Sequence, residues 1–503
     1  MNKNASFRRK IIYVIILAAL LYPMFLLSQP SSPGKDGQSG SPGGKLAQLR
    51  TEYGLDESEL GDVDIIATSF RLFGLTPIAD TILWDAANKY KMKKDWISLS
   101  ATLKQLARLM PHYESVWRFQ GWNLAYNVST EFDDYRQRYH WVIEGLKFLE
   151  NGVKMNKKSI RLTWDVAWHT SQKIGKSDER VQFRRLYKAD DDVHGSRPIE
   201  LRDCWLVGKD WYHKAEAIVD SGVPLGKISD VLFYSNAPMN QMNYSDNLEK
   251  DGRFDEKVER EWKKAQDEWT AFGNREIPTS QGQIIRLNDQ EFFANQEQQL
   301  SKELEEIQPG LREEMTQQKR LKLTPQQAAA YDKDWVDRNA DEINLANEAE
   351  EILRITNMEL AQRMSADRIE HGIEVAQKLD NAKEQSVWTD RYRDIVNFKY
   401  WRHRAAFEQL PDVIQARKLL YEGKKAFQQG DLTVSKRDYD QAFELIKKCK
   451  DLPQFAGLDD EDAFQLDFKA VMETYMKILE QRNEKLPDDF ILHDLWEKSG
   501  GDL

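Results

Sequence analysis

The chain of 503 residues has few of the side chains from which most catalytic and metal sites are built. Its two cysteines, Cys204 and Cys449, form no CxxC pair, which excludes a structural zinc site or a thioredoxin-like site of the usual spacing. The 8 histidines occur singly, and no HExxH, GxGxxG or GxSxG motif is present. We therefore expect a protein that is not an enzyme and has no catalytic, metal-binding or cofactor-binding residues.

Basic residues are also fewer than acidic ones. The chain has 72 Lys and Arg against 83 Asp and Glu, a net charge of −11. Nucleic-acid binding needs clustered Lys and Arg to contact phosphates, so we expect no nucleic-acid partner. In contrast, hydrophobic residues make up 41% of the chain and tryptophan occurs 15 times, enough to build packed cores. A chain of this length is expected to form several domains.

The N-terminus predicts a membrane anchor over residues 1–28. Its first ten residues, MNKNASFRRK, are basic, and an uncharged apolar run follows at 11–28. Such a run nearly crosses a hydrocarbon core of about 30 Å, and the basic flank should stay in the cytoplasm. A cleaved signal peptide is the alternative, but the residues after the run do not fit its small-residue cleavage site. We expect a single-pass protein of the inner (cytoplasmic) membrane with its soluble part on the extracytoplasmic, periplasmic side.

Composition and periodicity divide the remaining chain into five segments, which we expect to belong to the all-α class. They are a flexible Pro/Gly/Ser linker at 29–50, a helical repeat region at 51–180, an irregular region with short helices at 181–285, long amphipathic helices at 286–395 and a second helical repeat region at 396–503.

The region at 51–180 shows a spacing typical of paired helices. If Pro111 closes one 34-residue repeat, the next begins at Glu114. The first helix of that second repeat then carries an aromatic, a small and a large residue at Trp117, Gly121 and Leu124. The residues expected to face inward in the first repeat are Leu83, Ala87, Tyr90, Leu99, Leu103 and Leu106. This pattern resembles a divergent tetratricopeptide repeat.

The segment at 416–448 resembles that repeat more closely. Gly423, Ser435, Tyr439 and Ala442 stand where the family places small or bulky residues between paired helices. The resemblance implies stacked helical hairpins, like those of membrane-anchored, tetratricopeptide-like proteins of bacteria. It also implies grooves that hold protein or peptide partners of the cell envelope.

The helices expected at 286–395 have clear ends but an open role. Pro309 and Gly310 should break the first of them, and Thr324 with Pro325 should begin another. A coiled-coil arm and ordinary helix packing both fit, and the lack of a sustained heptad favours ordinary packing.

The irregular region supports an alternative hypothesis, in which the protein is an enzyme or binds a small ligand at a site around residues 204–244. Cys204 and His213 are nine residues apart, which places them on different faces of a helix and argues against a catalytic pair. Near Pro238, a cluster of polar residues would form either a polar pocket or a capped loop. This cluster comprises Asn240, Gln241, Asn243 and Tyr244.

Half a dozen aromatic residues are the candidates for partner binding. They are Trp117, Trp122, Tyr126, Trp141, Trp164 and Trp168. Aromatic residues at helical spacing also serve as core, so both roles remain open. Together these patterns predict a membrane-tethered helical-repeat scaffold for protein–protein interactions.

Overall fold

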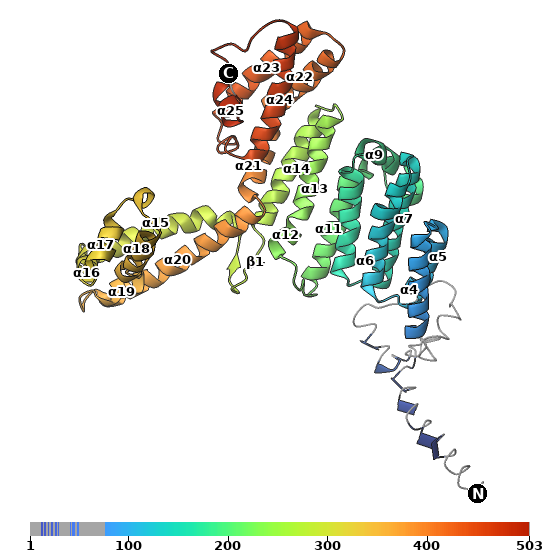
Figure 1. Cartoon of the computed structure of the whole chain (residues 1–503), viewed down its shortest axis with the longest axis horizontal. Helices are drawn as coiled ribbons and strands as arrows, with labels where there is room; N and C mark the ends of the chain where they lie inside the picture. The colour runs from blue at the N-terminus through green and yellow to red at the C-terminus, as the bar shows by residue number, and fades with distance from the viewer. Residues whose placement is uncertain are drawn as a thin grey trace. The chain divides into compact units, whose positions relative to one another are not determined.

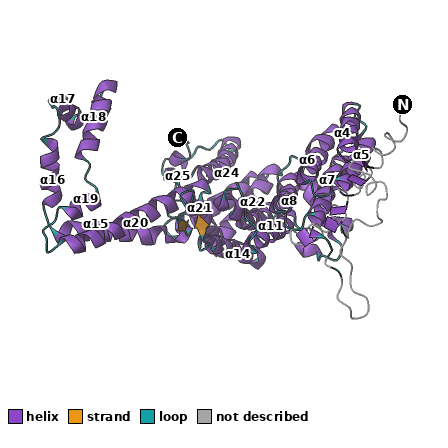
Figure 2. Cartoon of the chain, turned by 90° about the horizontal axis from the view of Figure 1, so that it is seen from below, coloured by secondary structure: helices purple, strands orange, loops and turns teal. Residues whose placement is uncertain are grey.

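The computed structural model describes residues 76–501 and scattered positions before residue 50. The predicted anchor at 1–28 and linker at 29–50 lie largely outside the described residues. No helix among those that are described is long and apolar enough to cross a membrane. The described chain is mostly helical, which confirms the all-α class (Figure 2). Its only strands in that part are β1 (Ile277–Pro278) and β2 (Ile284–Ile285), an antiparallel pair.

The chain packs as two compact units. The first comprises Met1–Ile228 with Met239–Tyr244, and the second comprises Ser229–Pro238 with Ser245–Leu503.

The first unit is a row of antiparallel helices, which lie side by side in Figure 1. Its elements are α4 (Thr76–Met92), α5 (Trp96–Leu109), α6 (Glu114–Trp122), η1 (Asn123–Val128), η2 (Ser129–Glu131), α7 (Tyr135–Met155), α8 (Ile160–Trp168), η3 (His169–Lys173), α9 (Arg180–Ala189), α10 (Asp191–His194), η4 (Ile199–Leu201) and α11 (Cys204–Asp220). The second predicted repeat and helix α6 both begin at Glu114. Within the first predicted repeat, Ala87, Leu99, Leu103 and Leu106 are buried, while Leu83 and Tyr90 are partly buried.

Glycines allow α6 and α7 to pack closely. A Cβ atom at Gly121 would lie 2.4 Å from Cγ of Leu149, and one at Gly152 would lie 2.7 Å from Cγ of Trp117. Real Cβ atoms do not approach other atoms so closely, so a larger residue would push the helices apart. The small residue predicted at Gly121 is therefore confirmed as a packing requirement.

The second unit is also helical. Its elements are α12 (Asp230–Tyr234), α13 (Asn236–Lys250), α14 (Glu256–Gly273), β1, β2, η5 (Leu287–Asp289), α15 (Gln290–Ile307), α16 (Leu311–Arg320), α17 (Pro325–Asp332), η6 (Trp335–Asp337), α18 (Ala340–Leu353), α19 (Asn357–Gln362), α20 (Ile369–Ile395), α21 (Phe398–Glu408), α22 (Pro411–Gln428), α23 (Leu432–Lys450), α24 (Asp462–Gln481) and α25 (His493–Lys498). Residues 239–244 of α13 belong to the first unit. The segment at 181–285, expected to be irregular with short helices, thus includes α11, α13 and α14, which have 17, 15 and 18 residues.

An arm formed by α15 to α20 has its own small core. Leu304, Leu311, Leu360 and Leu379 come from four different helices and pack together there. The break predicted at Pro309 and Gly310 separates α15 from α16, and Gly310 has a φ of 81°, which favours glycine. A capping box at Thr324 begins α17 as predicted.

The C-terminal hairpin of α22 and α23 confirms the predicted helix pairing. Gly423 lies against Tyr439, because a Cβ atom there would be 2.8 Å from Cδ2 of that ring. Ser435 is buried and donates its Oγ hydrogen to the carbonyl oxygen of Gly423 at 2.8 Å. Gly430, with a φ of 80°, forms the turn between the helices. Small residues therefore let the two helices approach each other.

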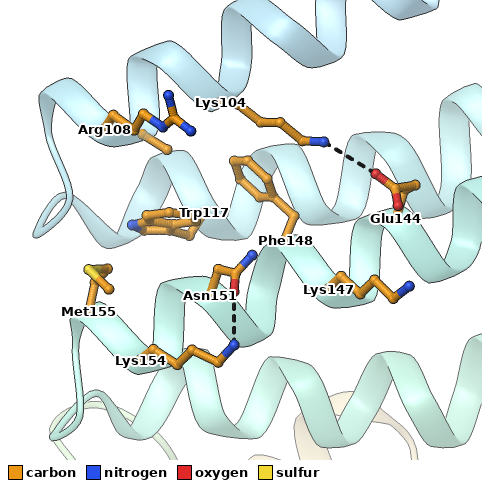
Figure 3. A pocket seen from close by; sticks show the side chains of 10 residues that line it. Lys104, Arg108, Trp117, Glu144, Lys147, Phe148, Asn151, Lys154 and Met155 are labelled. Atoms are coloured by element: carbon orange, nitrogen blue, oxygen red, sulfur yellow. Dashed lines mark hydrogen bonds and ion pairs between the residues drawn. The ribbon is translucent and has the colours of Figure 1, made fainter. Parts of the chain in front are cut away.

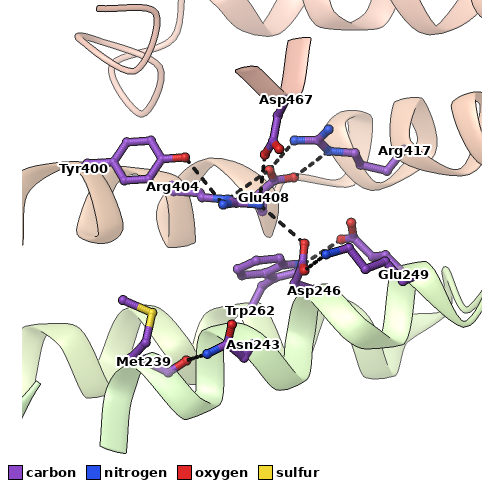
Figure 4. Close-up of polar contacts among 11 residues, drawn as sticks. Met239, Asn243, Asp246, Glu249, Trp262, Tyr400, Arg404, Glu408, Arg417 and Asp467 are labelled. Atoms are coloured by element: carbon purple, nitrogen blue, oxygen red, sulfur yellow. Dashed lines mark hydrogen bonds and ion pairs between the residues drawn. The ribbon is translucent and has the colours of Figure 1, made fainter. Parts of the chain in front are cut away.

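A buried charge cluster ties α13 and α14 to the C-terminal helices within the second unit (Figure 4). Arg417 forms a two-pronged ion pair with Glu408, whose side chain is almost fully buried. Arg404 lies 3.7 Å from Glu408 and 3.4 Å from Asp246. Buried ions lose their hydration, so such a cluster is stable only when each charge keeps its partners.

Candidate functional site

A groove in the first unit lies between α5 and α7, the second helices of two successive hairpins (Figure 3). Its cavity has a volume of about 530 Å³, within the range of pockets that hold small ligands or short peptide segments. The lining residues are Lys104, Ala107, Arg108, Trp117, Glu144, Lys147, Phe148, Asn151, Lys154 and Met155. We refer to this cavity as the α5–α7 groove.

The floor of the α5–α7 groove is apolar. Trp117, Phe148 and Met155 are each buried to about the same extent, with 5–6% of their surface exposed. The rings of Trp117 and Phe148 are 4.8 Å apart between centroids and tilted by 44°. Gly152 leaves room for Trp117 to lie directly on α7. The floor is therefore preformed by packing rather than assembled from mobile side chains.

One carbonyl group fixes the end of the groove. The carbonyl oxygen of Pro111 accepts hydrogen bonds from Nε1 of Trp117 at 2.8 Å and from Nδ2 of Asn156 at 2.9 Å. Asn156 also donates to the carbonyl oxygen of Gly152 at 2.9 Å. These bonds hold the turn between α5 and α6 against the end of α7. They also satisfy the buried indole N–H, which would otherwise be costly to bury.

The rim of the groove is cationic. Lys104 and Arg108 come from α5, and Lys147 and Lys154 come from α7. Glu144 is the one carboxylate among the lining residues, 3.4 Å from Nζ of Lys104. Lys154 donates to Oδ1 of Asn151 at 3.1 Å. The groove thus concentrates positive charge on a chain whose net charge is −11.

A second feature of the first unit is an aromatic ladder, made of Trp122, Tyr126, Trp168, Trp164 and Tyr212. Successive ring centroids are 6.0, 5.7, 6.4 and 6.0 Å apart. Trp122 is 41% exposed, whereas Tyr212 at the other end is buried. The ladder therefore runs from solvent into the core.

The helices that carry the ladder widen where it forms. Tyr126 lies in the π-helical segment η1, and His169 begins the π-helical segment η3. Such segments are rare and often occur at functional sites. Nδ1 of His169 is 2.8 Å from the carbonyl oxygen of Asp165, and burial lowers the pKa of His169, which keeps the ring neutral. Lys173 lies 4.7 Å from the centroid of the Tyr126 ring, a cation–π contact.

The six predicted aromatic residues do not form one site. Trp122, Tyr126, Trp164 and Trp168 come together in the ladder, as their helical spacing allows. Trp117 lies instead in the floor of the α5–α7 groove. Trp141 stacks on Phe132, with a centroid distance of 6.0 Å.

Sequence reasoning missed the cationic rim of the groove. The signal was present, because Lys104 and Arg108 are four residues apart and so share one helix face. Lys147, Asn151 and Lys154 are spaced by four and three residues and share a face in the same way. The sequence did not indicate that these two faces line the same groove.

The polar residues of the alternative site at 204–244 lie within α13 rather than in a loop. Asn240 is buried and donates to Oγ of Ser171 at 2.6 Å and to the carbonyl oxygen of Trp205 at 3.2 Å. Lys209 donates to Oε1 of Gln241 at 2.5 Å. These contacts give Asn240 and Gln241 a packing role between helices.

Two further side chains of that polar cluster also have packing partners. Tyr244 is buried, and Asn243 donates to the carbonyl oxygen of Met239 at 2.9 Å.

The two cysteines are free and buried, one in each unit. Burial raises the pKa of both the Cys204 and the Cys449 thiol, which disfavours the reactive thiolate. His213 is exposed and lies 3.1 Å from Glu216. Within the described residues no three His, Cys, Asp or Glu side chains are grouped to hold a metal ion.

Comparison with known proteins adds no family to this description. No family model matches the chain, and no curated protein matches it. The resemblance to tetratricopeptide repeats therefore rests on the residue pattern and the helical hairpins alone, and membership of that family stays a prediction.

Proposed function

We propose that the chain is a membrane-tethered helical-repeat scaffold that binds protein partners on the extracytoplasmic side of the membrane. The observation that carries this proposal is the α5–α7 groove. It is open, its apolar floor is preformed, and successive hairpins supply its walls. A rigid groove of this kind binds a peptide segment without first ordering its own side chains.

The aromatic ladder supports the same function. Tryptophan and tyrosine are enriched in protein interfaces and supply much of their binding energy. Trp122 exposes 41% of its surface at the open end of the ladder, where a partner can cover it. The rings behind it are held by stacking, so Trp122 is presented in a fixed orientation.

The proposed tether rests on the N-terminal sequence. A basic segment followed by the uncharged run at 11–28 is typical of an uncleaved anchor whose basic end stays in the cytoplasm. This orientation places the helical units on the opposite side of the membrane, among the proteins of the cell envelope.

Site-specific photo-cross-linking in intact membranes tests the proposal. A photoreactive phenylalanine analogue replaces Asn151, which is exposed within the groove. The matched control places it at Gln137, which is exposed on the same helix outside the groove. We expect a discrete cross-linked protein from position 151 and none from position 137. Identical cross-links from both positions, or none from either, would contradict a groove that binds protein partners.

A further inference from the structure

We propose that the α5–α7 groove is selective for acidic peptide segments, in which Asp or Glu alternates with apolar residues. This inference rests on the proposed function and names the chemistry of the partner. Four cationic side chains and one carboxylate line the groove, although acidic residues outnumber basic ones in the whole chain.

Charge complementarity favours an acidic partner for the groove. The field of an acidic chain repels an acidic peptide from most of its surface, whereas a local cationic cleft attracts it. Glu144 lies beside Lys104, and the partly buried Glu150 interacts electrostatically with Lys147 and Lys154. Arg108, Lys147 and Lys154 extend the positive charge along the rest of the groove. Hydrogen bonds between such cations and carboxylates are stronger than those between neutral groups.

The arrangement of charge around the floor is the second argument. Figure 3 shows Trp117 and Phe148 between the basic side chains of α5 and those of α7. Side chains of an extended peptide alternate in direction, so an alternating segment presents apolar groups to this floor and acidic groups to the rim. Lys104 and Arg108 are separated by about 6 Å along their helix, because each residue rises about 1.5 Å. Alternate residues of an extended peptide are about 6.6 Å apart, which matches that separation.

The apolar floor also argues against a simple anion site. Inorganic phosphate would contact only the rim, while a peptide side chain would also cover the small exposed parts of Trp117, Phe148 and Met155, each 5–6% exposed. The cavity of about 530 Å³ is also far larger than a single anion needs.

Fluorescence anisotropy with the full chain in neutral detergent micelles tests the proposal. The probe is a short fluorescein-labelled peptide that alternates glutamate with leucine and phenylalanine, and its analogue has glutamine in place of each glutamate. We expect the acidic peptide to bind about tenfold or more tightly than the analogue, with an affinity that falls as salt rises from about 50 to about 300 mM.

Two double variants with the same loss of charge identify the binding surface. Lys147→Ala with Lys154→Ala removes the α7 row, and we expect it to weaken binding of the acidic peptide about tenfold or more. The control is Lys157→Ala with Lys158→Ala, two exposed lysines just beyond α7 that do not line the groove. We expect this control to bind like the unaltered chain. Circular dichroism before each titration checks that both variants remain folded.

Three results would overturn the acidic-peptide assignment. They are equal binding of the two peptides, equal effects of the two double variants, and displacement of the probe by inorganic phosphate as readily as by unlabelled peptide. The photo-cross-linking at Asn151 separates this failure from failure of the proposed function. A cross-link that persists in the Lys147→Ala, Lys154→Ala chain would support the proposed scaffold function but contradict the proposed selectivity for acidic segments.

Discussion

Trp262 donates its Nε1 hydrogen to Oε1 of Glu249 at 2.6 Å, within the buried charge cluster of the second unit (Figure 4). Only 9% of the surface of Glu249 is exposed. Burial, and then the nearby Glu408, raise the pKa of Glu249 to about 8. At neutral pH this carboxyl group is therefore largely protonated, and it accepts the indole hydrogen bond as a neutral group.

Replacing Glu249 with glutamine should change how stability depends on pH. An unfolded glutamate has a pKa of about 4.3, so between about pH 4 and about pH 8 the unfolded chain holds fewer protons at this position than the folded chain. This group therefore lowers the free energy of unfolding as pH rises through that interval. Glu249→Gln keeps an acceptor for Trp262 and does not titrate. We expect the variant to resemble the unaltered chain near pH 4 and to be more stable near pH 8.

Urea unfolding followed by tryptophan fluorescence at several pH values measures this difference. Glu422→Gln serves as the control, because Glu422 is exposed on α22 in the same unit. Its stability curve should run parallel to that of the unaltered chain. A stability difference for Glu249→Gln that is the same at every pH would show that this carboxyl group does not titrate as expected.

Close packing of the C-terminal hairpin should make Gly423 intolerant of a side chain. Gly423→Val would drive a Cβ atom to within 2.8 Å of the Tyr439 ring, and overpacking of this kind costs about 1–3 kcal/mol. Lys424→Val introduces the same residue at an exposed neighbouring position and should change stability by about 0.5 kcal/mol or less. Chemical denaturation compares the two variants. Equal stabilities would mean that α22 and α23 do not depend on the close approach at Gly423.

Trp122 should matter for partner binding but not for folding. Its ring is 41% exposed at the open end of the ladder, so Trp122→Ala leaves the core largely intact. Truncation of a tryptophan at an interface commonly costs about 2 kcal/mol of binding free energy. We therefore expect the affinity for the protein partner identified by photo-cross-linking to fall more than tenfold. Phe119→Ala is the control, since Phe119 is 47% exposed on α6 and lies outside the ladder. Similar affinities for both variants would remove the ladder from the interface.

The two thiols should be unreactive in the folded protein. Cys204 and Cys449 are each 1% exposed, and burial raises the pKa of both thiols. We expect a thiol reagent to label them about a hundredfold or more slowly than in the denatured chain, because labelling must await local opening. A cysteine introduced at the exposed Ser221 should be labelled at once. Rapid labelling of the unaltered folded chain would contradict the burial of at least one thiol.

Removal of residues 1–28 should release the protein from the membrane. We propose that the apolar run at 11–28 holds the chain in a bilayer. The remainder lacks the basic residues of the N-terminus and is more acidic than the full chain with its net charge of −11, so it has little attraction to anionic lipids. Fractionation after alkaline carbonate extraction compares the full chain with the shortened one. A full chain recovered in the soluble fraction would contradict the proposed anchor.

The sequence by itself determined many of the helices and some of the contacts within their hairpins. Local signals encode these features: Glu114 begins α6, Gly310 lies in the break before α16, and Thr324 caps α17 through its own side chain. Packing within the hairpins could also be predicted from the sequence, because the small residues Gly121 and Gly423 stand opposite bulky ones at fixed spacing. Both kinds of signal act over a few residues or between neighbouring helices.

Only the tertiary structure decided where the side chains gather. Trp117 and Trp122 are five residues apart on one continuous helical stretch, yet one lies in the groove floor and the other ends the ladder. The basic rows of α5 and α7 became one groove only when the hairpins packed side by side. Glu249 acquired its raised pKa from burial beside residues more than 150 positions away, such as Glu408. Burial and charge at a site depend on contacts between distant segments, and no local pattern in the sequence records those contacts.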